Sequence, residues 1–127
     1  MIVLASHEYL EQILTIERSA FSKPWTEYHF KSDLNNKISV NWVYLNNIQV
    51  IGYLFGWHVM DEYHLNNIAV AKRFRENGTA IHLLKNMVSY LNDIKVKSVF
   101  LEVSSSNLPA RKLYEKMGFV PQGERKD

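Results

Sequence analysis

The segment "AKRFRENGTAIHLL", residues 71–84, brings a glycine and several basic side chains to the start of an expected helix. The first-turn amides of a helix have no partner within the helix and carry a partial positive charge, so they can bind an anion. Gly78 and the small Ala80 would let a phosphate approach these amides closely. The neighbouring cations that would add charge are Lys72, Arg73 and Arg75. The pattern therefore indicates an anion-binding loop.

The same segment also permits a simpler interpretation, in which Asn77 caps the helix and Gly78 lies in a loose turn. No Gly-Lys-Ser/Thr follows, which excludes a Walker loop, and the single glycine excludes a dinucleotide-binding fingerprint. The segment taken alone leaves an anion site and an ordinary helix start both open.

Three residues near the C-terminus could also do chemistry. Glu102 is the lone acid in the apolar run "VKSVFLEV", a pattern that also fits an exposed or lysine-paired carboxylate. Tyr114 lies on the apolar stripe of the last expected helix, where a tyrosine is usually a core residue with its hydroxyl satisfied. Asn107 could cap that helix. The pattern alone leaves a structural role open for each.

Cysteine is absent, which removes a disulfide framework, a thiolate zinc site and a cysteine nucleophile together. The histidines show no metal-ligand spacing, and we expect no bound metal. These histidines are His7, His29, His58, His64 and His82. Any group transfer must therefore use another nucleophile or none.

Length and composition predict one domain spanning residues 1–127. The chain is 46% hydrophobic and has no internal repeat, which suits a single core. A net charge of +2 makes a nucleic-acid partner unlikely. The N-terminal apolar run is too short for a signal peptide or membrane span, which predicts a soluble cytoplasmic protein.

The first half of the chain should supply two helices and an antiparallel strand pair. After a short strand in "MIVLA", Ser6 and Thr26 stand where caps of two helices belong. The β-branched and aromatic runs of residues 38–59 divide at Asn46-Asn47, and asparagine tolerates the positive φ of a hairpin turn.

The second half should alternate strands and helices. "EYHLNNIAV" reads as a strand, and a helix follows whose apolar stripe is formed by Ile81, Leu84, Val88 and Leu91, widened by Leu83, Met87 and Tyr90. "VKSVFLEV" predicts a central strand covered on both faces, followed by a helix ending at Gly118 and a final strand. The order β-α-α-β-β-β-α-β-α-β predicts a mixed α/β domain with antiparallel strands first and parallel crossovers later.

Several segments resemble one family in the same order. "Arg75-x-x-Gly78-x-Ala80" resembles the acyl-CoA pyrophosphate loop of the GNAT superfamily of N-acetyltransferases. "FSKPWTEYHF", "DEYHLNNIAV", "FLEVSSSN" and "ARKLYEKMGF" resemble segments of its RimI-like members, the ribosomal-protein alanine N-acetyltransferases. The resemblance covers Ile16 to Phe119, and implies a GNAT-like sheet flanked by helices.

The resemblance implies direct transfer of an acetyl group from acetyl-CoA to a protein N-terminal α-amino group, possible acceptors including a ribosomal protein. Glu102 matches the family's general base and Tyr114 its general acid. The resemblance would place Trp25 in the acceptor pocket, but a buried anchor is the favoured interpretation. The implied cofactor-binding residues are Ile68, Ala69, Val70, Arg75, Glu76, Asn77, Gly78, Thr79, Ala80 and Asn107, with the oxyanion donors among the amides of residues 68–70.

Two features depart from the family pattern. Glu76 places a negative charge in the loop where relatives commonly carry a basic residue. After Phe119 relatives continue into a strand pair beside the acceptor, whereas this sequence stops at "QGERKD". The departure leaves three alternatives: a truncated chain, a partner or second copy that pairs with an open sheet edge, or a non-catalytic acyl-CoA-binding remnant.

Overall fold

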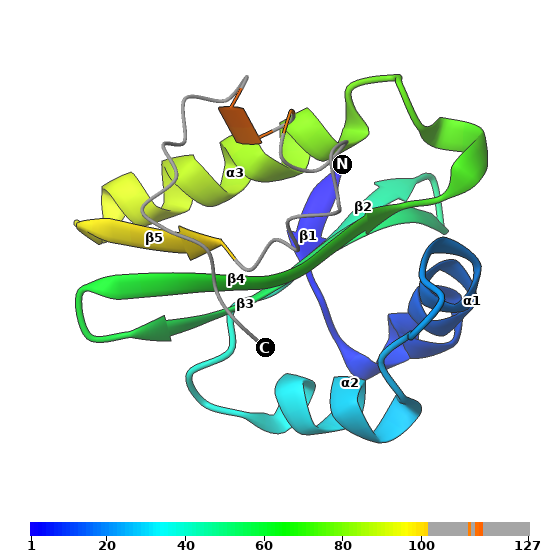
Figure 1. The fold of residues 1–127 in the computed structure, drawn as a ribbon, viewed down its shortest axis with the longest axis horizontal. Coiled ribbons are helices and arrows are strands. Elements are labelled where there is room, and N and C mark those ends of the chain that lie inside the picture. Colours follow the sequence, from blue (N-terminus) through cyan, green and yellow to red (C-terminus); the bar gives the residue numbers. More distant parts are fainter. Residues whose placement is uncertain (102–111, 113, 116–127) are drawn as a thin grey trace.

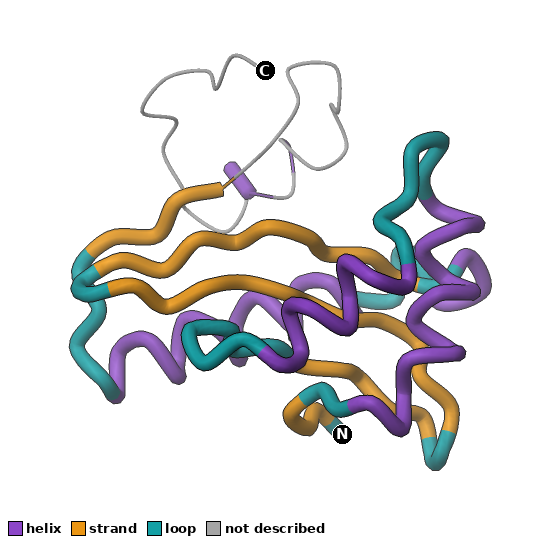
Figure 2. Tube along the Cα trace, turned by 90° about the horizontal axis from the view of Figure 1, so that it is seen from below, coloured by secondary structure: helices purple, strands orange, loops and turns teal. Residues whose placement is uncertain are grey.

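The computed structural model describes residues 1–101, 112, 114 and 115. Within them, five strands form one sheet in the order β1-β2-β3-β4-β5. Figure 2 shows the strands lying side by side. They are β1 (Ile2–Leu4), β2 (Trp42–Asn46), β3 (Gln49–Val59), β4 (Glu62–Val70) and β5 (Ser98–Leu101). The first four pair antiparallel, and β4 pairs with β5 in parallel.

Helices cover both faces of this sheet (Figure 1). Helices α1 (Leu10–Ala20) and α2 (Glu27–Asn35) lie on one face, called here the α1/α2 face, and α3 (Thr79–Asp93) lies on the other, the α3 face. Short 3₁₀ turns occupy His7–Tyr9 and Lys72–Phe74, and Lys112, Tyr114 and Glu115 are helical. The structure confirms the mixed α/β sheet expected from the sequence.

Local chemistry explains where most elements begin and end. The Thr26 hydroxyl accepts a hydrogen bond from the His29 amide at 3.1 Å, which confirms the predicted cap of α2. Asn47 has φ +58° in the turn between β2 and β3, as predicted. The expected cap at Ser6 is wrong: Ser6 makes no capping hydrogen bond, its hydroxyl donates to Glu8, and α1 begins only at Leu10.

The buried side of α3 is centred slightly off the predicted stripe. Leu83, Leu84, Met87 and Leu91 are buried against the sheet, whereas Ile81 and Val88 are only half-buried. The breadth predicted from the sequence is therefore correct, and its centre is not.

Strand β5 is less covered than its apolar composition suggested. Val99 and Leu101 pack against the core of the α3 face, but the Phe100 side chain on the opposite face is 42% exposed and stacks on the His64 ring. In the described part of the sheet β5 is one of the two edge strands, β1 being the other. The expectation of a strand covered on both faces is thus not met by residues 98–101.

A β-bulge in β4 reverses which side chains face each layer. Phe55 lies opposite Asn67 and Gly56 lies opposite Leu65, so Asn66 is an extra residue in β4. Before the bulge, Leu65 packs on the α3 face; after it, Asn67 points to the α1/α2 face, where its amide reaches α1. The bulge therefore decides the orientation of β4 from Asn67 to Val70.

Gly56→Ala should strongly destabilise the fold. A Cβ at this position would collide with the Tyr63 hydroxyl and lie 2.6 Å from the His64 carbonyl oxygen. Tyr63 is fully buried and its hydroxyl donates to Val40 O at 2.6 Å, so the ring has little room to move. We expect a loss of about 2–4 kcal/mol, combining overpacking with a strained hydrogen bond.

Urea unfolding measures this loss, with Gly52→Ala as the matched control in the same strand. A Cβ at Gly52 would meet its nearest neighbours at 3.1–3.3 Å, so a smaller loss is expected there. Equal losses for the two variants would contradict the proposed clash with Tyr63.

Candidate active site

The loop before α3 has the geometry of an anion site. Gly78 is the N-cap residue of α3 with φ +82°, a left-handed conformation that favours glycine. No side chain caps the helix, so the first-turn amides of Thr79 and Ala80 lack both an intrahelical partner and a side-chain acceptor. The alternative in which Asn77 caps the helix is wrong, because the cap position belongs to Gly78.

The space beside Gly78 is open. An added Cβ would meet only the His82 ring, 3.9 Å away. Open space next to outward-facing amides at a helix start suits a phosphate, because the partial positive charge of the helix start can reach the anion directly. The residues present therefore fit an acyl-CoA pyrophosphate, although Glu76, at φ +66° and exposed, adds a negative charge to the loop.

Hydrogen bonds hold the loop against the end of β4. The Arg75 side chain donates through Nε to Val70 O at 3.0 Å, and the Thr79 hydroxyl donates to Phe74 O at 3.4 Å. The Arg73 guanidinium lies 5.8 Å from the centre of the Phe74 ring. The basic side chains Lys72, Arg73 and Arg75 are exposed, so their charges remain accessible to an anion.

Strand β4 presents backbone donors beside this loop. Ala71 N donates to Ile51 O on β3 at 2.8 Å, and antiparallel ladders alternate, so the amides of Ala69 and Asn67 also face β3. The amides of Ile68 and Val70 then face the opposite edge of β4. Among the described residues, β5 pairs with β4 only as far as Leu65, so no described strand covers this edge next to Ile68 and Val70.

Tyr114 lies in the core of the α3 face. Its side chain is 7% exposed, and burial raises the pKa of its phenol to about 12. The phenol therefore keeps its proton at neutral pH, which suits both interpretations offered by the sequence, a core residue and a proton donor. Glu102 and Asn107 lie outside the described residues.

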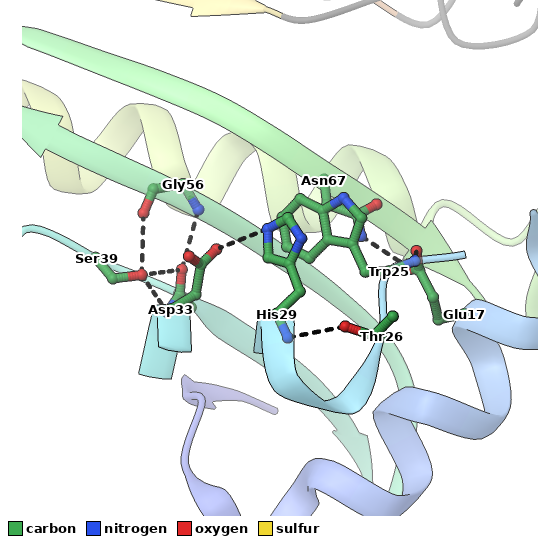
Figure 3. A network of polar contacts seen from close by, with 9 residues as sticks. Glu17, Trp25, Thr26, His29, Asp33, Ser39, Gly56 and Asn67 are labelled. Atoms are coloured by element: carbon green, nitrogen blue, oxygen red, sulfur yellow. Dashed lines mark hydrogen bonds and ion pairs between the residues drawn. The ribbon is translucent and has the colours of Figure 1, made fainter. Parts of the chain in front are cut away.

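The segment around Trp25 forms an aromatic cluster on the α1/α2 face. Trp25 is half-buried, and its ring stacks on His29 with centroids 3.7 Å apart (Figure 3). The ring also contacts Phe30 and Phe55. These contacts support the interpretation of Trp25 as an aromatic anchor. The side chain is only half-buried, so part of it remains accessible.

Sequence reasoning overlooked a buried carboxylate next to this cluster. Glu17 is 1% exposed and accepts hydrogen bonds from Tyr53, Asn67 and the Trp25 amide. A signal was present, because Glu17 continues the apolar stripe of α1 formed by Ile13 and Leu14, and an acid at a core position is rare unless paired. Only the fold shows which donors it meets.

The described residues lack two further kinds of feature. Residues 1–101 with 112, 114 and 115 contain no group of three or more His, Cys, Asp or Glu side chains placed to hold a metal ion. No helix in this part of the chain is long and apolar enough to cross a membrane.

Comparison with known proteins identifies the family. Residues 10–119 match the Acetyltransferase (GNAT) family, so the chain belongs to this family and is an N-acetyltransferase. The family uses acetyl-CoA as its acetyl donor.

The chain is similar to enzymes that acetylate a ribosomal protein. It is 33% identical over 117 residues to the ribosomal protein bS18-alanine N-acetyltransferase of Haemophilus influenzae, covering 92% of this chain and 79% of that protein. It is 33% identical over 104 residues to the enzyme of the same name from Escherichia coli K12, covering 82% of this chain and 70% of that protein. A crystal structure of the E. coli ribosomal-protein-S18-alanine N-acetyltransferase superposes with a TM-score of 0.84 at 30% identity, covering 93% of this chain and 77% of that one.

Proposed function

We propose that this chain transfers an acetyl group from acetyl-CoA to a protein N-terminal α-amino group, of the ribosomal-protein alanine type. The observation that carries the proposal is the uncapped start of α3 behind Gly78, which fits a pyrophosphate beside the end of β4, where no described strand pairs with Ile68 and Val70. The names of the similar enzymes support the choice of acceptor.

The cofactor contacts are proposed from the loop geometry and the resemblance. The amides of Gly78, Thr79 and Ala80 bind the pyrophosphate, with charge from Arg75 and backbone contacts from Glu76 and Asn77. Asn107 contacts the pantetheine arm. Of residues 68–70, the ladder geometry favours Ile68 and Val70 as donors, because the Ala69 amide faces β3.

The reaction is a direct attack in a ternary complex. An α-amino group has a pKa near 7.7–8.0, so Glu102 can accept its proton, directly or through a water, without a large pKa shift. The amine nitrogen bonds to the thioester carbon, and the oxyanion that forms is stabilised by the Ile68 or Val70 amide. The C–S bond then breaks, and Tyr114 gives its proton to the departing thiolate.

Three further expectations belong to the proposal. We expect the protein to act in the cytoplasm and to recognise a protein N-terminus rather than nucleic acid. A homodimer through an open sheet edge stays a prediction, and the edge strands of the described sheet are β1 and β5.

Calorimetric titration of the purified chain with acetyl-CoA tests the proposal, using Gly78→Asn as the variant. Asparagine tolerates a left-handed φ, so the fold should persist, but its side chain would fill the space needed by the phosphate. We expect micromolar binding by the native chain and a loss of at least about 10-fold in the variant, equivalent to about 1.4 kcal/mol.

Asn47→Gly serves as the control, because it changes another left-handed residue far along the chain from the loop. Equal affinity in the native chain and Gly78→Asn would remove this loop from the cofactor site. No binding by the folded native chain would reject the enzyme proposal. Binding without turnover of peptides carrying an N-terminal alanine would favour the acyl-CoA-binding remnant.

A further inference from the structure

The buried carboxylate of Glu17 connects three separate parts of the chain to α1. Its Oε1 accepts hydrogen bonds from the Tyr53 hydroxyl on β3 at 2.6 Å and from the Asn67 amide nitrogen on β4 at 2.8 Å. Its Oε2 accepts one from the backbone N–H of Trp25 at 2.9 Å. Figure 3 shows Glu17 beside Trp25 and Asn67. A carboxylate this deeply buried is retained only when donors satisfy it, and these three do so.

Tyr53 is suited to donate permanently to this carboxylate. Burial, together with the hydrogen bond to Glu17, raises the pKa of the Tyr53 phenol far above its usual value, so the hydroxyl retains its proton. The bond from Tyr53 therefore holds Glu17 Oε1 at a fixed place above β3. The same oxygen is then available to bind the side chain of the neighbouring strand.

The bond to Asn67 acts at the β-bulge. Asn67 is the first residue after the extra residue Asn66, and its side chain can reach Glu17 only because the bulge turns it to the α1/α2 face. Side-chain and amide directions alternate together along a strand, so a one-residue shift of phase would turn the Ile68 and Val70 amides toward β3. Holding Asn67 therefore fixes which amides of β4 face away from β3.

The bond to Trp25 acts on the opposite side of the carboxylate. The Trp25 amide belongs to the segment between α1 and α2, which packs against Phe30 and Phe55 through the Trp25 ring. One side chain thus fixes this segment and the bulged strand relative to each other. The alternative is a purely structural role, in which the Glu17 carboxylate only satisfies buried donors and stabilises the core.

We infer that Glu17 is a positioning residue that fixes the Trp25 segment against the bulge of β4 and so orients the backbone donors of Ile68 and Val70. The inference rests on the proposed function, in which these amides polarise the thioester carbonyl. Glu17 touches no substrate itself; it acts through Asn67 on one side and through the Trp25 backbone on the other.

Two variants separate the link from Glu17 to β4 from the link to the Trp25 segment. Asn67→Ala removes only the link to β4, and the thioester carbonyl should then be polarised less. In Glu17→Gln, the new NH₂ group can no longer accept a hydrogen bond. If this group faces the Trp25 N–H, one hydrogen bond is lost; if it faces the Tyr53 hydroxyl and the Asn67 amide, two donors lose their acceptor, so the first orientation is favoured. Glu17→Gln should therefore loosen mainly the Trp25 segment.

The experiment is infrared difference spectroscopy of bound acetyl-CoA labelled with ¹³C at the carbonyl, combined with kinetics on a peptide carrying an N-terminal alanine. In the native chain the bound carbonyl band should lie below its frequency in water. In Asn67→Ala the band should return toward the free value, and kcat should fall by about 100-fold, the effect of a misplacement of about 1 Å, with acetyl-CoA affinity nearly unchanged. In Glu17→Gln the band should stay low while KM for the peptide rises.

Tyr63→Phe is the matched control, because it removes a buried hydrogen bond from β4 before the bulge, on the α3 face. If Glu17 has a purely structural role, the carbonyl band stays low in Asn67→Ala and the activity of all three variants follows their stability. That result would overturn the inference about Glu17 and leave the proposed function standing. A native chain that binds acetyl-CoA without lowering the carbonyl frequency would overturn the inference and leave the cofactor site standing. A native chain that fails to bind acetyl-CoA would overturn the proposed function and the inference with it.

Discussion

Glu102→Gln is expected to lower kcat by about 10²–10⁴-fold while leaving acetyl-CoA affinity within about twofold, because a general base contributes this much to the rate and little to cofactor binding. Glutamine keeps the size and hydrogen-bonding reach of the side chain but cannot accept the proton of the acceptor amine. Steady-state kinetics on a peptide with an N-terminal alanine gives kcat, and calorimetry gives the affinity.

Glu115→Gln provides the control for this prediction. Glu115 is an exposed carboxylate next to Tyr114 in the sequence, so its removal changes the net charge equally without touching the proposed base. Unchanged turnover in Glu102→Gln would remove Glu102 from the mechanism. Loss of acetyl-CoA binding in the same variant would indicate a structural role instead.

Tyr114→Phe is expected to lower kcat by about 10²–10⁴-fold through loss of the general acid, with the core of the α3 face retained. The ring packs in a buried cluster with Trp42, Leu65 and Leu84, and phenylalanine preserves that packing. Kinetics with a thioester whose leaving thiol has a lower pKa provide the control, because a better leaving group needs less help from an acid and should restore part of the rate.

The pH dependence follows from the same residue. The Tyr114 pKa of about 12 lies above the usual value of about 10, so the phenol proposed as proton donor stays protonated through neutral pH. We expect kcat/KM to rise up to about pH 8, as the acceptor amine loses its proton, and to stay level to at least about pH 10. A decline beginning near pH 8 would contradict the assignment of Tyr114 as the acid.

Folding stability should also depend on this group. A pKa raised in the folded state favours folding fully below about pH 10 and ceases to do so as the pH rises toward 12. Tyr53 and Tyr63 have pKa values shifted in the same direction by burial. Urea unfolding from pH 9 to 11 should therefore show a falling stability, and the fall should be smaller in Tyr114→Phe.

Much of the fold follows from local interactions that can be predicted from the sequence. The cap at Thr26 and the left-handed turn at Asn47 depend on side chains next to the backbone they stabilise. Gly78 belongs to the same group, because its left-handed φ of +82° is a local conformation that glycine adopts at little cost. These features need no knowledge of distant residues.

Other features could not be read locally. Ser6 precedes a 3₁₀ turn instead of capping α1, and the deepest residues of α3 lie off the centre of the predicted stripe, because contacts with the rest of the fold choose among locally similar arrangements. The exposure of Phe100 depends on which strand and helix cover β5, which periodicity does not reveal.

The sequence by itself determined the class of fold and the family resemblance, and it predicted a pyrophosphate loop before α3, since each rests on residues close together along the chain. Only the tertiary structure decided which amides of β4 face away from β3, and that Glu17 meets Tyr53, Asn67 and Trp25. The physical reason is that a bulge is a property of two paired strands, and the donors of a buried carboxylate come from segments 8, 36 and 50 residues away.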